Sequence, residues 1–470
     1  MKKRSNITVM AKLIGLVRPL TGYMILAIFL GLLGHLCASL LTVFGGYALL
    51  GIAGVYKVPT GFVFTLLLVC AFARGFLRYG EQSCNHFIAF KLLALLRDRV
   101  FFALRKLSPA KLEGRDRGDL IAVITSDIEL LEVFYAHTIS PAVIAFLFTV
   151  TACVFIGSFH PLLGVVALVA YLTVGLLVPF LLSKANGDNG LRFRERSGAL
   201  SGFVLDSLRG LSETIQYGQG AERLRRMNEQ TDALAEDEAR MKRLAGRGTA
   251  VTGAVILTAD LVMLVCASFL YQGGAVGFDG VLIPTLTLMS SFGPVVALAN
   301  LGSTLQNTFA AGNRVLDILE EKPQVEEVTG KEKVTFRDAG AEQVTFSYGS
   351  ETILSDVSCK IAANTVTGII GKSGSGKSTL LKLFLRFFEV KQGEIKISGV
   401  PVADINTSDL RAMESYMTQE TSLFHDSIAN NLKVAKPDAT EEELTAACKK
   451  ASIHDFIMSL PEGYDTEVGE

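Results

Sequence analysis

The sequence predicts an α-helical transmembrane domain of six spans, followed by an α/β P-loop nucleotide-binding domain that is truncated at its C-terminus. Three observations support this fold class. Half of the 470 residues are hydrophobic and only 19% are charged. The mean hydropathy of +0.39 is too high for an ordinary soluble protein. A glycine-rich phosphate-binding pattern follows the apolar segments in the last third of the chain.

The apolar segments define the predicted spans, because a helix needs about 20 such residues to cross a bilayer. They lie near Gly22–Leu50, Gly61–Gly80, Ile139–Ser158, Leu162–Leu182, Thr249–Tyr271 and Val281–Leu301. Lysine and arginine gather in residues 91–117 and 184–247, whereas the short connections opposite hold almost none. By the positive-inside rule, we expect a multi-pass protein with both termini in the cytoplasm.

The two basic stretches have the composition of helices rather than loops. Phe87–Leu107 and Glu222–Leu244 contain neither glycine nor proline, so the spans should continue as helices into the cytoplasm. Glycines then predict short cross-pieces near Arg115–Leu120 and Gln216–Ala221. We therefore expect an N-terminal elbow at residues 1–20, a six-span domain at 21–319, a linker at 320–333 and a partial nucleotide-binding domain at 334–470.

Short β-rich runs alternate with turns after Val334, as in an α/β domain. We expect strands at Gln343–Phe346, Val357–Ile361, Val366–Ile370 and Gly393–Gly399. The seven cysteines form no C-x-x-C pair, so neither a disulfide framework nor a zinc site is expected. The net charge of −1 argues against a nucleic-acid partner.

The phosphate-binding pattern G-x-x-x-x-G-K-[ST] is complete and lies between a predicted strand and a predicted helix. We expect ATP binding by Gly371, Lys372, Ser373, Gly374, Ser375, Gly376, Lys377, Ser378 and Thr379. Lys377 would reach the β- and γ-phosphates, and the Ser378 hydroxyl would bind Mg²⁺. The alternative is a glycine-rich turn that binds nothing.

These residues resemble the ABC transporters in which a membrane domain is fused to the ATPase, in the six-helix exporter fold. Tyr348 lies where this family has its adenine-stacking aromatic residue. Gln419 matches the glutamine that contacts Mg²⁺ and the attacking water, which implies a metal-binding and catalytic role. Residues 466–470 resemble the loop that contacts the cross-pieces. The resemblance implies ATP-driven export by a dimer of half-transporters.

A narrower resemblance lies in the membrane half, to the CydC-type subunit of the exporter needed for cytochrome bd assembly. It is carried by Arg78–Glu81, Ser83, His86, Leu107–Pro109, Gly118–Leu120, Ser126–Asp127 and Ile139–Pro141. This resemblance implies a bacterial-type plasma membrane, a CydD-type partner, and export of a thiol such as cysteine or glutathione. It also implies a link to haem, with His86 as the residue that would contact haem or substrate.

Other interpretations stay open. His86 is equally consistent with a solvated histidine on a helix just past the membrane surface. The partner could be a second copy of this chain. The transported substance could be a drug, a lipid or a peptide. A non-transporting membrane sensor that binds ATP, or an importer half, are further alternatives.

The sequence also predicts that these 470 residues alone do not hydrolyse ATP. Residues 334–470 number 137 (470 − 334 + 1), fewer than a whole domain of this family. Downstream of Gln419 there is no apolar strand ending in Asp-Glu, no Leu-Ser-Gly-Gly-Gln signature and no switch histidine. Without these groups the water is neither positioned nor activated. We therefore expect a truncated gene product or a fragment of a longer transporter.

Overall fold

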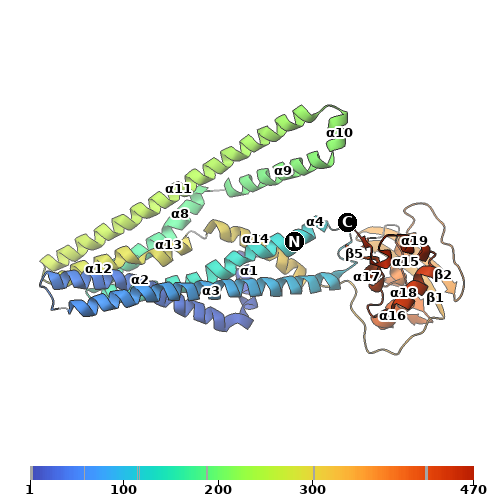
Figure 1. The fold of residues 1–470 in the computed structure, drawn as a ribbon, viewed down its shortest axis with the longest axis horizontal. Helices are drawn as coiled ribbons and strands as arrows, with labels where there is room; N and C mark the ends of the chain where they lie inside the picture. Colours follow the sequence, from blue (N-terminus) through green and yellow to red (C-terminus); the bar gives the residue numbers. More distant parts are fainter. Residues whose placement is uncertain are drawn as a thin grey trace. The chain divides into compact units, whose positions relative to one another are not determined.

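The computed structural model describes residues 4–57, 59–113, 115, 117–186, 189–299, 302–418 and 422–469. The chain divides into two compact units, Met1–Pro323 and Gln324–Glu470. The first unit consists of helices, and the second combines a small sheet with short helices (Figure 1).

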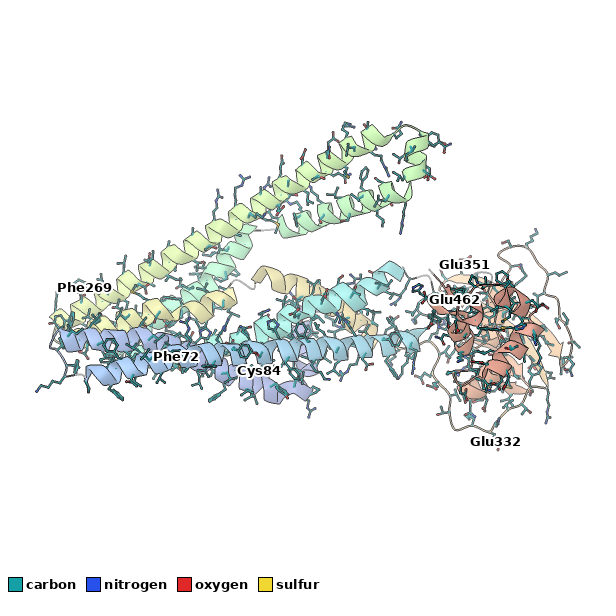
Figure 2. All side chains as sticks on the ribbon, in the orientation of Figure 1. Phe72, Cys84, Phe269, Glu332, Glu351 and Glu462 are labelled. Carbon is teal, nitrogen blue, oxygen red and sulfur yellow. The ribbon has the colours of Figure 1, made fainter. Side chains whose placement is uncertain are left out.

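Six helical segments of the first unit are long and apolar enough to cross a membrane, judged by length and composition. They run over Arg18–Ile52, Gly61–Leu107, Gly118–Gly157, Pro161–Leu182, Gly220–Gln272 and Phe278–Ala299. These segments confirm the six predicted spans and the predicted helical extension of the second span to Leu107. Phe72 and Phe269, labelled in Figure 2, are each 69% exposed, as expected for side chains that face lipid.

The helices of the first unit have the following bounds. They are α1 (Asn6–Leu16), η1 (Arg18–Leu20), α2 (Thr21–Ile52), α3 (Thr60–Leu107), α4 (Arg117–Ala122), η2 (Val123–Asp127), α5 (Ile128–Phe134), η3 (Tyr135–Ile139), α6 (Ser140–Gly157), α7 (Pro161–Leu172), η4 (Thr173–Leu177), α8 (Val178–Asn186), α9 (Asn189–Arg209), α10 (Leu211–Gln216), α11 (Gly220–Gln272), α12 (Phe278–Ser291), α13 (Gly293–Ala299) and α14 (Gly302–Glu320).

Two features interrupt the regular helices. The segments η2, η3 and η4 are single π-helical turns within longer helices. In η3 the Thr138 hydroxyl donates to the carbonyl oxygen of Val133, five residues earlier, at 3.2 Å. The predicted sixth span is divided, because α12 ends at Ser291 and α13 begins at Gly293; Leu301, its predicted end, lies outside the described residues.

The second predicted cross-piece is placed wrongly by the sequence. We expected it near Gln216–Ala221, but the short helix at the tip is α10, which lies between α9 and α11 (Figure 1). Gly218 has a φ of +65° in the turn after α10, and α11 already begins at Gly220. The glycines therefore end the cross-piece rather than form it. The first predicted cross-piece, Arg115–Leu120, overlaps α4, whereas Gly114 and Asp116 lie outside the described residues.

Two apolar clusters hold the first unit together. One joins the elbow helix α1 to α3, α5 and α14 and contains Leu13, Leu96 and Leu131. The other joins α6, α7, α11 and α12 and contains Tyr171, Met263 and Leu288. The elbow is also held by charge, because Arg4 pairs with Asp317 at 2.6 Å and with Glu320 at 3.1 Å on α14. The Arg4 side chain is only 7% exposed, so this contact is largely shielded from solvent.

The second unit is built on a four-stranded antiparallel sheet with strand order β2-β1-β3-β4. Its strands are β1 (Asp338–Tyr348), β2 (Glu351–Ala362), β3 (Gln392–Ile397) and β4 (Val400–Pro401), and a separate pair joins β5 (Asp426–Ser427) to β6 (Glu467–Val468). Its helices are α15 (Lys377–Phe384), η5 (Val402–Asp404), α16 (Thr407–Met413), α17 (Ile428–Lys433), α18 (Glu441–Lys450), α19 (His454–Met458) and η6 (Gly463–Asp465).

One predicted strand is absent. Val366–Ile370 has no regular secondary structure, and the side chains of Val366 and Ile370 are fully exposed. Such a run becomes a strand only where a neighbouring strand forms hydrogen bonds with its backbone. The described residues of the second unit provide no such neighbours, so the run stays open to solvent.

Part of the predicted linker belongs to the second unit. The backbone N–H of Val328 donates to the Thr407 hydroxyl at 3.0 Å, and the N–H of Thr407 donates to the Val328 carbonyl at 2.9 Å. The backbone N–H of Lys331 donates to the Asn406 side chain at 2.8 Å. The chain is therefore fixed to the N-terminal end of α16 before β1 begins.

Candidate functional site

The glycine-rich loop runs from Gly371 to Ser378 and leads into α15. Gly374 and Gly376 have φ angles of +79° and +87°, in the left-handed region that favours glycine. A Cβ atom at Gly376 would lie 2.7 Å from Leu354 Cδ2 on β2. The loop therefore needs glycine at position 376 both for its backbone angle and for its close approach to the sheet.

The side chain of Lys377 folds back onto the first residues of the loop. Its Nζ donates to the carbonyl oxygens of Gly371 at 3.0 Å and Lys372 at 2.9 Å, so the ammonium group lies across the loop mouth. Lys377 is also the first residue of α15, whose N-terminal N–H groups favour an anion. Positive charge and free amide donors thus converge at the place where the pattern predicts phosphate.

Ser378 and Thr379 occupy different environments on the first turn of α15. Ser378 is exposed, as a hydroxyl that binds a metal ion from solvent must be. The side chain of Thr379 is buried and supports the turn, so the group that this residue can offer to a phosphate is its backbone N–H. The predicted second Mg²⁺ ligand, Gln419, lies outside the described residues.

Tyr348 belongs to an aromatic cluster at the end of β1. Its ring centroid lies 5.0 Å from that of Phe346 and 5.2 Å from that of Phe388, both edge-on. Phe346 pairs in the sheet with Leu354, the residue whose side chain lies against Gly376. Tyr348 is 37% exposed, so part of its ring is available for stacking on a base. Through Phe346, this ring lies close to Leu354, the residue that supports the loop.

Two charged residues of the second unit have pKa values changed by burial. Burial raises the pKa of the Glu414 carboxyl group to about 7, although Arg411, 3.3 Å away, opposes the shift. Burial also lowers the pKa of Arg386, which follows α15. Neither shift in pKa was predictable from the sequence, because both depend on what packs over these side chains.

His86 lies on α3 of the first unit, two residues after Cys84 (Figure 2). Its Nδ1 is 3.6 Å from the Glu132 carboxylate, and its ring stacks on Phe90 with centroids 5.9 Å apart. The ring of His137, in the π-helical turn η3, lies 5.7 Å away. Sequence reasoning missed Glu132 and His137, which are about 50 residues away along the chain. No group of three or more metal-ligating side chains occurs among the described residues.

The folds and the loop define the class of protein. Residues 24–295 match the model of the ABC transporter transmembrane region, and residues 354–466 match the ABC transporter ATP-binding model. The chain belongs to the ABC transporter family, as an exporter with fused transmembrane and ATP-binding domains.

Individual relatives are consistent with this family. The chain is 42% identical to a "Probable ABC transporter ATP-binding/permease protein" of Haemophilus influenzae, over 100% of this chain and 85% of the relative. It is 28% identical to an "ATP-dependent lipid A-core flippase" of Desulfotalea psychrophila, over 86% of this chain and 71% of the relative. Its fold matches a solved bacterial Atm1-family ABC exporter with ATP bound, with a TM-score of 0.81, 21% identity, and coverage of 96% of this chain and 80% of the other.

Proposed function

We propose that this chain is one half of an ABC exporter that couples ATP binding and hydrolysis in a dimer to export across a bacterial-type plasma membrane. The observation that carries the proposal is the phosphate-binding loop with Lys377 across its mouth, in a chain that also has six apolar spans. The test is ATP-dependent movement of substrate into inside-out vesicles that hold the dimer with its chain extended through the catalytic motifs, because the 470 residues alone are expected to bind ATP without turnover. Nucleotide binding without movement would favour a membrane sensor instead.

The nucleotide site that we propose consists of Gly371–Thr379 around the phosphates and Tyr348 on the adenine. Ser378 would bind Mg²⁺, and Gln419 would bind Mg²⁺ and orient the attacking water. Lys377 would exchange its two carbonyl partners for phosphate oxygens, which are charged and therefore stronger acceptors. The binding of ATP by this site rests on the family and on the loop; the role of each residue is our proposal.

Lys377→Ala tests the site directly. Loss of the ammonium group should weaken ATP binding by about tenfold or more, since hydrogen bonds to charged groups contribute about 1.5–3 kcal/mol. Thermal stability should change little, because Lys377 makes only loop contacts. Fluorescent-nucleotide titration and thermal melting of the detergent-solubilised chain measure the two quantities. Lys391→Ala, an exposed lysine of the same unit, is the matched control. Unchanged affinity in Lys377→Ala would overturn the assignment.

For the substrate, we propose a thiol such as cysteine or glutathione, exported in support of cytochrome bd assembly. The support is the CydC-type pattern in the membrane half, which includes Arg78–Glu81 and His86. A lipid or a drug is the second candidate, because relatives over most of the chain are named as a lipid A-core flippase and a fatty acid transporter. Proteoliposomes that contain the version extended through the catalytic motifs, tested in parallel with radiolabelled glutathione and fluorescent lipid, would separate them according to which one moves with ATP.

His86 is the residue we propose for contact with haem or substrate. Its Nδ1 is buried and accepts or donates no hydrogen bond among the described residues, so the ring could turn toward a ligand. Haem would supply an iron ion that a neutral imidazole can ligate. Haemin titration followed by absorbance should give a weaker change in His86→Ala than in wild type. His160→Ala, at the start of α7, is the control.

The partner we propose is a CydD-type half-transporter, with a homodimer as the alternative. Co-purification of the chain with and without that partner would distinguish them. We further propose that both termini are cytoplasmic, and that the domain boundaries are 1–20, 21–319, 320–333 and 334–470. We also propose that the partial ATP-binding domain, by itself, binds nucleotide without turnover.

A further inference from the structure

A carboxyl group lies deep inside the membrane-spanning part of α11. Asp260 is 12 residues before the end of α11 at Gln272 (272 − 260 = 12), which is roughly 18 Å along the helix axis. That depth is near the middle of a hydrocarbon layer about 30 Å thick. Asp260 is only 8% exposed, and Met263 and Ala267 on the following turns are fully buried in the cluster shared with α6, α7 and α12.

Asp260 has no compensating partner among the described residues. Its Oδ1 is buried and forms no hydrogen bond, and no basic side chain in the part of the chain that the structure describes forms an ion pair with it. An ionised carboxylate in such a place would cost several kcal/mol. The surroundings therefore select the neutral carboxylic acid.

Few titratable groups lie on the helices that cover this part of α11. The basic Lys184 of α8 is further along, because Leu182 lies beside Gly248, 12 residues before Asp260 (260 − 248 = 12). On α2, which packs on the same cluster through Leu32 and Leu36, His35 contacts Phe148 rather than α11. On α7, Tyr171 interacts electrostatically with Asp260, and on α6, Cys153 lies near Tyr171. On α12 the one charged residue, Asp279, is in the first turn at the far end from Ser291. Cys266 is on α11 itself. None of these groups neutralises a carboxylate.

The Tyr171–Ser291 pair leaves no hydroxyl proton for Asp260. The Ser291 hydroxyl donates to the carbonyl oxygen of Leu288 at 2.8 Å. Tyr171 and Ser291 are bonded at 2.5 Å, so the Tyr171 hydroxyl must be the donor in that pair. Both hydroxyl protons are therefore used within this network, and neither stabilises a carboxylate at Asp260.

From this arrangement we propose that Asp260 is a proton-binding site of the membrane domain. In the packing described, the carboxyl group lies between α7, α11 and α12 and is protonated. A movement of α11 that admits water would let the group ionise and release the proton to solvent. A proton needs no cavity, which fits the close packing of these helices. The site is independent of the nucleotide site and of the substrate proposed above.

The test uses the full chain in proteoliposomes and dicyclohexylcarbodiimide, a membrane-soluble reagent that requires a protonated carboxylic acid. We expect mass spectrometry to find the label on Asp260 at about pH 7, well above the usual carboxyl range. Asp279, which accepts a hydrogen bond from the Tyr56 hydroxyl at 3.1 Å, is only half-buried and should stay unlabelled. It serves as the internal control.

Infrared spectroscopy gives a readout that does not depend on reagent access. We expect a carbonyl band of a protonated acid in the wild type and in Asp260→Glu, and its loss in the near-isosteric Asp260→Asn. The infrared comparison uses a Glu414→Gln background, because the pKa of Glu414, about 7, would add a second protonated-acid band. If Asp260→Asn fails to fold, the label on Asp260 in the wild type decides the question. No protonated-acid band at about pH 7 in the Glu414→Gln background would overturn the proposal, and so would a band that remains when Asp260→Asn is added and the protein folds.

Discussion

Glu414, at the C-terminal end of α16, has a carboxyl group that is partly removed from water. In the part of the chain that the structure describes, its Oε1 is buried without a hydrogen-bond partner, and its one ion pair is with Arg411. The folded-state pKa, about 7, lies above the ordinary value of 4.5, so the folded protein holds this proton more tightly than the unfolded chain does. The carboxylate therefore costs stability, and the cost grows as the pH rises from about 4.5 through about 7.

Glu414→Gln should consequently stabilise the second unit above about pH 7 and should have little effect below about pH 4.5, where the carboxyl group is neutral in both states. We expect a gain of about 1 kcal/mol at the higher pH, after allowance for solvent screening. Differential scanning fluorimetry at about pH 8 and about pH 5 measures the difference in melting temperature from wild type. Glu462→Gln, an exposed glutamate, is the control. A loss of stability at the higher pH would show that the Arg411 pair outweighs burial.

Single residues were predictable where a local pattern encodes the chemistry. Gly376 and Lys377 are fixed by a short motif, because the loop's backbone angles and its charge are local properties. Asp260, Glu414 and the neighbours of His86 were not predictable in their roles. Their properties depend on burial and on contacts between helices that are distant in the sequence. Neither can be read from a single sequence.

Elements of the membrane domain followed from composition. Apolar length gave the six spans, and the absence of glycine and proline gave the long extension of α3. The π-helical turns were not visible, since one extra residue in a helix leaves no mark in an apolar sequence. The tip α10 was misplaced because glycine marks both the start and the end of a turn.

The orientation of these elements is a prediction from charge. Single cysteines at Arg105, Arg225 and Ser158, in a cysteine-free background, should react with an impermeant maleimide in intact cells only at Ser158. Ser158 lies in the short connection between α6 and α7, which has no lysine or arginine. Substitution there leaves the cap formed by His160 on α7 in place. Permeabilised cells provide the positive control for Arg105 and Arg225. Labelling of either in intact cells would contradict the topology.

For the whole molecule, the second unit combines a packed sheet with an exposed apolar run. The phosphate-binding loop lies between this run and α15, and Val366 and Ile370 are exposed. Fully burying two such side chains would contribute about 3–6 kcal/mol.

We expect the 470-residue chain to bind ATP without steady-state hydrolysis, because the catalytic base and the signature motif do not occur in its sequence. A version extended through those motifs should release phosphate and should show lower exposure of Ile370 to a hydrophobic dye. A malachite-green assay on both forms measures the rates, with Lys377→Ala as the blank. Equal rates in the two forms would mean that the catalytic residues lie elsewhere in this chain.

The helix α11 is a single rod of 53 residues that joins the membrane interior to α10, about 80 Å from end to end. A tilt of about 5° around its end at Gln272 would displace the opposite end by about 7 Å. Angular changes as small as thermal bending thus become displacements at α10 larger than the width of a side chain. A pair of spectroscopic probes, one on α10 and one on α3, would measure this displacement directly as a change in the distance between them.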